Sequence, residues 1–282
     1  MHLITCPSGF AGNARGLKIR ELQLLADPNL VRGGKNIDIM LGLLSEVTQP
    51  GPYDFQVGSK PNWDAALLGD RFAALIDIRC ATWGSEYEFR VRCEECGEGY
   101  EWELDLRDLP RKNFPKATLE QLADGGKNEF EIVGPEGQAV VFKILRGADE
   151  KAMDAYRRRN GGQWGPGDAL AQKIQSVDGV KPGELREWIF NLDAEPAREL
   201  QDQMDAHDGG VETNIQTVCT HCQWEQDIRL PFGKTFFAPS KKKAPKTMTT
   251  APGTDPPTTP GASGAGTDRT ESDSSFPEKK TG

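Results

Sequence analysis

Residues 93–96 read CEEC and residues 219–222 read CTHC, and these two cysteine pairs give the strongest indication of the fold. Each lies between two segments in which apolar and polar residues alternate. These segments are YEFRVR (87–92) and YEWEL (100–104) around the first pair, and NIQTV (214–218) and WEQDI (224–228) around the second. Alternation with a period of two is typical of strands. We therefore expect each cysteine pair at the turn of a β-hairpin.

Four cysteine thiolates carried on two such turns supply the complete ligand set of a tetrahedral zinc site, the arrangement of a zinc ribbon. The sequence therefore predicts that one structural Zn²⁺ per chain is bound by Cys93, Cys96, Cys219 and Cys222. More than a hundred residues separate the two pairs, so the ribbon is split, and we expect the metal to hold the intervening insertion at its base. Four thiolates leave no open coordination position, which indicates a structural metal.

Other interpretations of the cysteines stay open. A CxxC pair also forms a disulfide or carries out thiol redox chemistry, although redox pairs normally begin a helix, whose dipole lowers the thiol pKa. Iron in a rubredoxin-like site takes the same four thiolates as zinc. His221 offers a nitrogen ligand inside the second pair but is interpreted as an exposed turn residue. Cys6, in a Gly-rich and mobile start, and Cys80, on an apolar helix face, are interpreted as bystanders.

The pattern of segments along the chain predicts an α+β fold with N-terminal helices and a mixed, mainly helical insertion. The clearest helix is expected at 70–83, where apolar residues recur every three or four positions. Another is expected from Asn36 or Asp38 through Val47. In the insertion we expect strands at 129–133 and 139–145, and helices at 150–159, 168–177, 183–192 and 195–206.

These elements divide the chain into regions. We expect a flexible N-terminus (1–16), an N-terminal helical region leading into the first hairpin (17–92), the split zinc ribbon (86–105 and 211–232), an inserted β-hairpin plus helical subdomain (106–210) and a disordered tail (240–282). The tail is dominated by Lys, Thr, Pro, Ser and Gly. Such a composition buries too little apolar surface to offset the entropy of ordering the chain.

Charge argues against a nucleic-acid partner. The whole chain carries a net charge of −9 and the tail a net +2, which leaves −11 on the body. Binding to a phosphate backbone requires clustered Lys and Arg. The basic runs, at 157–159 and 241–243, are interpreted as a solvated helix end and as part of the tail.

The sequence also argues against a membrane protein and against an enzyme. No apolar run reaches the length that spans a bilayer, and the first residues lack the apolar segment of a secretory signal. Six cysteines, four of them in metal-like spacing, fit a reducing, intracellular environment. The three histidines stand in no metalloprotease or triad pattern, and no phosphate-binding loop is present. We therefore expect a non-catalytic protein.

Several stretches together resemble the baseplate hub proteins of T-even-type phages with contractile tails, described as baseplate hub subunits or tail assembly chaperones. These stretches are GDR (69–71) before an apolar helix, WGSEY (83–87) before the first hairpin, IQSVDG (174–179) and the closing segment 219–237. The resemblance covers most of residues 17–239. It implies a structural role near the central hub, other tail proteins as partners, and a location in the virion baseplate and, during assembly, in the host cytoplasm.

Two other functions stay open, a nucleic-acid-binding or transcription-factor-like module and a CxxC redox protein. The first requires basic residues around the hairpin turns, where acidic residues predominate, and the second requires thiols that cycle without loss of the fold. For contacts with partners, we single out Phe232, Phe236 and Phe237, a docking or core-closing segment, and Trp164 in its Gly- and Pro-rich loop.

Overall fold

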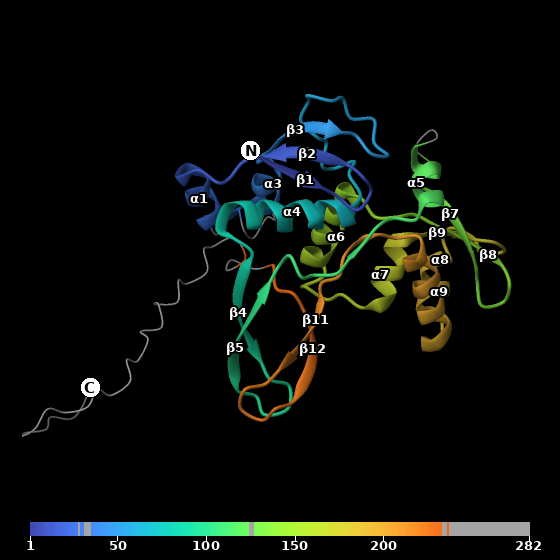
Figure 1. Ribbon diagram of the computed structural model, residues 1–282. Coiled ribbons are helices and arrows are strands. Elements are labelled where there is room, and N and C mark those ends of the chain that lie inside the picture. Colours follow the sequence, from blue (N-terminus) through green and yellow to red (C-terminus); the bar gives the residue numbers. More distant parts are fainter. Residues whose placement is uncertain (28, 31–34, 124–126, 233–235, 237–282) are drawn as a thin grey trace, which may run out of the picture. The chain divides into compact units, whose positions relative to one another are not determined.

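The computed structural model describes residues 1–27, 29–30, 35–123, 127–232 and 236, and within them the chain has an α+β fold (Figure 1). This part contains eight helices and five small antiparallel sheets. All of these residues belong to one compact unit, residues 1–241. The expected disordered tail (240–282), its basic run at 241–243 and Phe237 lie outside the described residues.

The N-terminal residues form an antiparallel sheet, so the expectation of a flexible stretch at 1–16 is wrong. The sheet consists of β1 (His2–Thr5), β2 (Ala11–Ala14) and β3 (Leu44–Gln49), in the order β1-β2-β3. Ile4 and Phe10 are buried, and so is Cys6. β2 reads AGNA and has little intrinsic strand preference. Residues 2–14 are ordered by burial against neighbouring elements, which no local sequence pattern predicts.

The segment that follows divides into a helix and a strand where one helix through Val47 is expected. α3 (Lys35–Leu41) ends just before Gly42, whose backbone N–H still donates to the Asp38 carbonyl at 2.9 Å. β3 then starts at Leu44, which is buried together with Val47. Glycine is among the weakest helix formers, and pairing with β2 supplies the backbone hydrogen bonds that further helical turns would have given.

α4 (Leu68–Trp83) confirms the helix predicted at 70–83 and is central to the first of two apolar cores. α4 contacts α3, β1, α6 and β10, and is therefore covered on several sides. As a result, even three of its charged residues are buried: Asp70, Arg71 and Arg79. The amphipathic α1 (Ile19–Ala26) contacts α3 at the edge of the same core.

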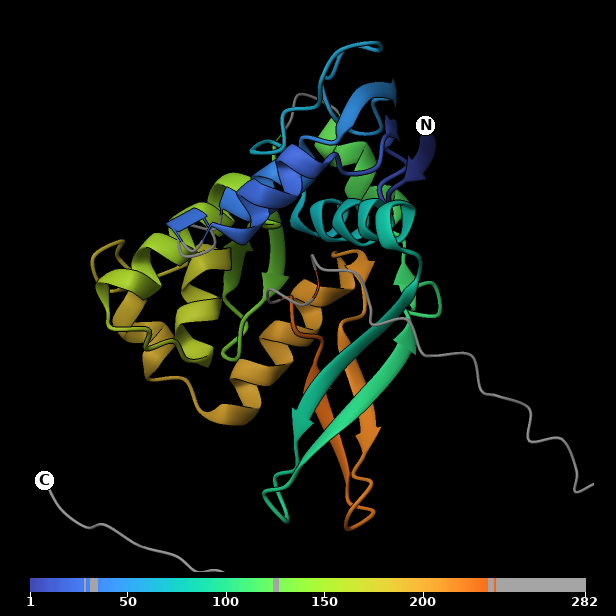
Figure 2. The ribbon, with the colours of Figure 1, turned by 90° about the vertical axis from the view of Figure 1, so that its left-hand side faces the viewer.

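Each cysteine pair lies at the turn of a β-hairpin, as predicted. The first hairpin consists of β4 (Glu86–Arg92) and β5 (Gly99–Asp105), and the second of β11 (Asn214–Val218) and β12 (Glu225–Arg229). Each hairpin is a two-stranded sheet of its own. Figures 1 and 2 show the two hairpins side by side, with both turns at the same end and pointing away from α4.

The insertion between the hairpins is mixed and mainly helical, with a separate apolar core. Its elements are, in chain order, β6 (Arg111–Lys112), α5 (Lys116–Ala123), β7 (Phe130–Val133), β8 (Ala139–Phe142), α6 (Gly147–Arg159), α7 (Pro166–Lys173), β9 (Ile174–Val177), α8 (Leu185–Phe190), α9 (Ala194–Ala206) and β10 (Gly210–Val211). The helix expected at 168–177 ends at Lys173, because Ile174 and Val177 are buried as part of a strand that pairs with β8.

The neck of the insertion is closed by backbone pairing. β6 follows the first hairpin and β10 precedes the second, and they pair with Lys112 opposite Gly210. The N–H of Glu212 extends this contact by donating to the Pro110 carbonyl at 2.8 Å. The cysteines lie at the opposite ends of the hairpins. The expectation that metal holds the insertion at its base is therefore corrected, since a short ladder closes the base and the cysteine cluster joins the tips.

Candidate metal centre

The four predicted ligands come together at the tips of the hairpins. The sulfur atoms of Cys93, Cys96, Cys219 and Cys222 all lie within 4.8 Å of one another. Across the two hairpins, Cys93 Sγ lies 3.6 Å from Cys222 Sγ, and Cys96 Sγ lies 3.8 Å from Cys219 Sγ. A tetrahedral site with Zn–S bonds of about 2.3 Å requires sulfur–sulfur separations of about 3.8 Å. The donor set therefore fits a four-thiolate metal ion in number, chemistry and spacing.

The two cysteine turns have the same backbone hydrogen bonds. In the first, the Cys93 N–H donates to the Glu98 carbonyl at 2.9 Å and the Gly97 N–H to the Cys93 carbonyl at 3.1 Å. In the second, the equivalent bonds start from Cys219 and Gln223 and measure 2.9 and 3.0 Å. Gly97 and Gln223 have φ values of 74° and 63°, in the left-handed region. Gln223 is the only described non-glycine residue with a positive φ, so the second turn adopts this geometry despite its sequence.

The sulfurs differ in exposure and are all free thiols. Cys93 and Cys219, the first of each pair, are buried, whereas Cys96 and Cys222 are exposed. No disulfide joins them, within or across the pairs. His221 is exposed and contributes its backbone N–H, which donates to Cys219 Sγ at 3.4 Å, as the interpretation of this residue as an exposed turn residue required.

The pKa values of two cluster thiols shift in opposite directions: that of Cys219 is lowered and that of Cys222 is raised. Burial opposes ionisation of Cys219, but the backbone N–H groups of Cys222 and His221 outweigh it and lower its pKa to about 6. At Cys222, the N–H of Trp224 acts in the same direction. Burial and hydrogen bonds with the other three cysteine sulfurs nevertheless raise the pKa of Cys222 to about 12. A nearby cation would offset the electrostatic cost of further thiolates, because it holds coordinating thiols in the deprotonated form.

The base of the first hairpin packs on aromatic residues singled out in the sequence. The ring of Phe236 is buried, 5.3 Å from Tyr87 and 4.9 Å from Phe232 between centroids. The Tyr87 hydroxyl also donates to the Pro231 carbonyl at 2.7 Å. Phe236 therefore closes the core. Trp164 lies elsewhere, with the Arg157 guanidinium 4.4 Å from its ring centroid.

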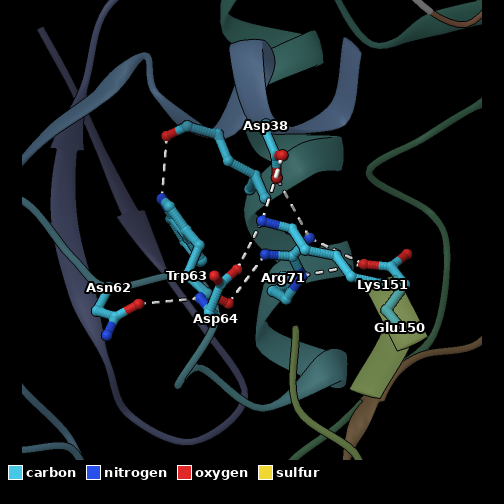
Figure 3. A network of polar contacts seen from close by, with 8 residues as sticks. Asp38, Asn62, Trp63, Asp64, Arg71, Glu150 and Lys151 are labelled. Atoms are coloured by element: carbon cyan, nitrogen blue, oxygen red, sulfur yellow. Dashed lines mark hydrogen bonds and ion pairs between the residues drawn. The ribbon is translucent and has the colours of Figure 1, made fainter. Parts of the chain in front are cut away.

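α4, which leads directly into the first hairpin, is fixed by a network of charged residues (Figure 3). The buried Arg71 donates to Glu150 of α6 from two nitrogens, at 2.8 and 3.1 Å, and to the Trp63 carbonyl at 2.9 Å. Lys151, beside Glu150, pairs with Asp64 at 2.8 Å. These contacts tie α4 to the insertion and to the loop that precedes it, so the direction in which α4 enters the hairpin is well defined.

The two remaining cysteines lie outside the cluster. Cys6 Sγ donates to the Asp70 carbonyl at 3.6 Å, and burial raises the pKa of this thiol well above its usual value. Burial likewise raises the pKa of Cys80 to about 11. Neither thiol is therefore activated as a nucleophile or ligand near neutral pH.

Two buried polar residues of the second hairpin, Thr217 and Gln226, were not anticipated from the sequence. They face the first hairpin on the same side of the ladder as Ile215 and Ile228. In the sequence, each is a polar residue in a strand, and alternation alone does not tell whether such a residue faces the core or solvent, because a shift of one residue in register exchanges the two faces.

Comparison with known proteins gives one finding. The family model described as T4 bacteriophage base plate protein matches residues 55–238, more than half of the chain. Neither the curated proteins nor the solved structures provide a match. None of the described helices combines the length and the apolar composition of a membrane-spanning segment. The matched region includes α4, both cysteine hairpins and the whole insertion, and the chain therefore belongs to the family of T4 bacteriophage base plate proteins.

Proposed function

We propose that this protein is a structural subunit or assembly chaperone of a contractile-tail baseplate hub, stabilised by one structural Zn²⁺ at Cys93, Cys96, Cys219 and Cys222. The observation that carries the metal is the convergence of four thiols, from turns more than a hundred residues apart, at separations that suit tetrahedral zinc. The family match carries the role in the baseplate. The protein acts through contacts with other tail proteins, in the host cytoplasm during assembly and in the virion tail, and performs no catalysis.

Zinc is favoured over thiol redox chemistry by the position of the cysteines. Both pairs follow strands, β4 and β11, and not helix N-termini, where a dipole would activate a redox thiol. The pairs also face each other across the two hairpins, which suits one shared ion better than two independent disulfides. When bound, zinc supplies binding free energy that becomes folding free energy. The chain's own residues supply the paired turns that hold the thiols.

Protein contacts are favoured over nucleic-acid binding by the charge around the hairpin turns. Exposed acidic side chains surround the cluster: Glu94, Glu95, Glu98, Glu225 and Asp227. A nucleic-acid surface needs clustered basic residues in this position. The acidic tips would repel a phosphate backbone and suit partners with basic or neutral surfaces.

Assembly of the tail in infected cells tests this function. In phage that encode Cys93→Ser together with Cys219→Ser, we expect few complete baseplates by negative-stain electron microscopy, because the two hairpins lose their metal. Cys80→Ser, which removes a thiol outside the cluster, is the matched control and should leave baseplates intact. Normal baseplates from the double variant would contradict a structural metal, and normal particles from phage lacking the whole protein would contradict the baseplate role.

A further inference from the structure

Gln226 of β12 connects the second hairpin to the first beside the metal cluster. Its side chain is buried, with 6% of the residue exposed. Its Oε1 accepts a hydrogen bond from the Glu94 backbone N–H at 2.9 Å, and its Nε2 donates to the Arg92 carbonyl at 3.1 Å. Glu94 and Arg92 are the two chain neighbours of Cys93. One amide group therefore fixes the backbone on both sides of one ligand.

A second buried polar residue, Thr217, lies directly opposite Gln226 and does not bond to the cysteine turn. Gln226 pairs with Thr217 across the second hairpin. The hydroxyl of Thr217 lies 2.8 Å from that of Tyr100 in the first hairpin and donates to the Gln226 carbonyl at 3.3 Å. The two hairpins thus share a buried polar seam, in which Thr217 joins strand to strand and only Gln226 reaches the backbone that carries Cys93.

Loss of the Gln226 amide would leave two backbone groups without partners. The Glu94 N–H and the Arg92 carbonyl would then have to move toward water, because unpaired polar groups are costly when buried. Such a movement would displace Cys93 relative to Cys222, whose sulfur lies 3.6 Å from that of Cys93. A four-thiolate site tolerates little displacement, since partners outside the ligand set commonly account for 10–100-fold in metal affinity.

We infer that Gln226 is a positioning residue, which holds Cys93 in place for the metal by bonding to the backbone on both of its sides. This inference rests on the proposed metal site. It predicts that Gln226→Leu binds Zn²⁺ about 10–100-fold more weakly than the wild-type chain. It also predicts that the Co²⁺ derivative of this variant loses intensity in the d–d absorption bands that report a tetrahedral four-thiolate ion.

The test compares three variants of the full chain, with Zn²⁺ affinity from competition with a chromogenic chelator and with Co²⁺ absorption spectra. Gln216→Leu is the matched surface control, because the amide of Gln216 is exposed and, within the described part of the chain, bonds only to Glu225, at 3.4 Å. Thr217→Val removes a buried hydrogen bond of the same seam without touching the neighbours of Cys93. Both should keep wild-type spectra and affinities within a few-fold, although Thr217→Val should lower the melting temperature. If Gln226→Leu does not fold, Gln226→Met, of similar length, replaces it.

The outcomes separate this inference from the proposed function. A wild-type chain that binds neither Zn²⁺ nor Co²⁺ contradicts the metal site itself. Wild-type binding that persists unchanged in Gln226→Leu or Gln226→Met overturns the role of Gln226 alone. Equal loss in Thr217→Val and Gln226→Leu also overturns it, because the effect would then follow from general destabilisation. Selective loss in the Gln226 variants supports it.

Discussion

α4 crosses the chain that returns to the second hairpin at a point where no side chain fits. A Cβ atom added at Gly69 would lie 2.0 Å from the Gly209 carbonyl oxygen and 2.8 Å from its carbon. Ordinary contacts between carbon and a carbonyl oxygen begin at about 3.3 Å, so Gly69→Ala requires one backbone to move by about 1 Å. Movement is restricted on both sides, because α4 is buried and Gly210 begins the β10 strand that closes the neck.

We therefore expect Gly69→Ala to lower the free energy of unfolding by about 1–3 kcal/mol, the usual cost of forcing atoms into a packed site. At about 2–4 °C per kcal/mol for a chain of this size, the melting temperature should fall by about 2–12 °C. Urea and thermal unfolding followed by circular dichroism measure both quantities. The matched control is Gly183→Ala, since no atom lies within 4 Å of the added Cβ. Equal stability of the two variants would refute the close crossing of α4 and the returning chain.

Other substitutions test the turns, the α4 network and the pH dependence. Gly97→Ala should cost about 1–2 kcal/mol, because φ is 74° while the added Cβ meets nothing closer than 4.0 Å. Gln223→Gly should be neutral or stabilise by up to about 1 kcal/mol, and the opposite signs in urea unfolding would contradict the equivalence of the two turns. Glu150→Gln should cost about 1.5–3 kcal/mol in the same assay by removing the nearer of the two carboxylate charges that face the buried Arg71, and an unchanged midpoint would argue against that ion pair. A hydrogen bond from Arg15 lowers the pKa of Glu21, in α1, to about 2. The stability that this carboxylate contributes is therefore present above about pH 4.5 and is lost as pH falls toward 2. Stability curves of wild type and Glu21→Gln should therefore converge in acid, and parallel curves from pH 6 to 2 would contradict this shift.

The sequence was sufficient to predict the hairpins, the proximity of the four cysteines and α4. Each depends on a local pattern: alternation around the CxxC pairs, and apolar residues at helical spacing over 70–83. The ladder that closes the neck has no such pattern, because each strand has two residues and Lys112 and Gly210 are far apart in the chain. β1 and β2 were missed for a related reason, since they are ordered by the packing of β1 against α4 and by the pairing of β2 with β3, which is distant in the sequence.

The roles of individual polar residues were also beyond the sequence. From alternation alone, the Gln226 side chain could lie on either face of the second hairpin. Its amide is buried because it contacts the first hairpin, which is distant in the sequence. Phe236 was open to two interpretations, docking and core closure. Its burial against Tyr87 decides for the core, and this contact joins positions that no local pattern connects.

The structural zinc site is tested by the metal content of the purified full chain, measured by inductively coupled plasma mass spectrometry together with a count of reactive thiols. We predict one zinc ion per chain. The four cluster thiols should become reactive toward a thiol reagent only after a chelator removes the metal. The reactivity of the buried Cys6 and the half-buried Cys80 should not depend on the metal. Absence of metal, combined with cluster thiols that oxidise and are reduced reversibly while the fold persists, would contradict the structural zinc site.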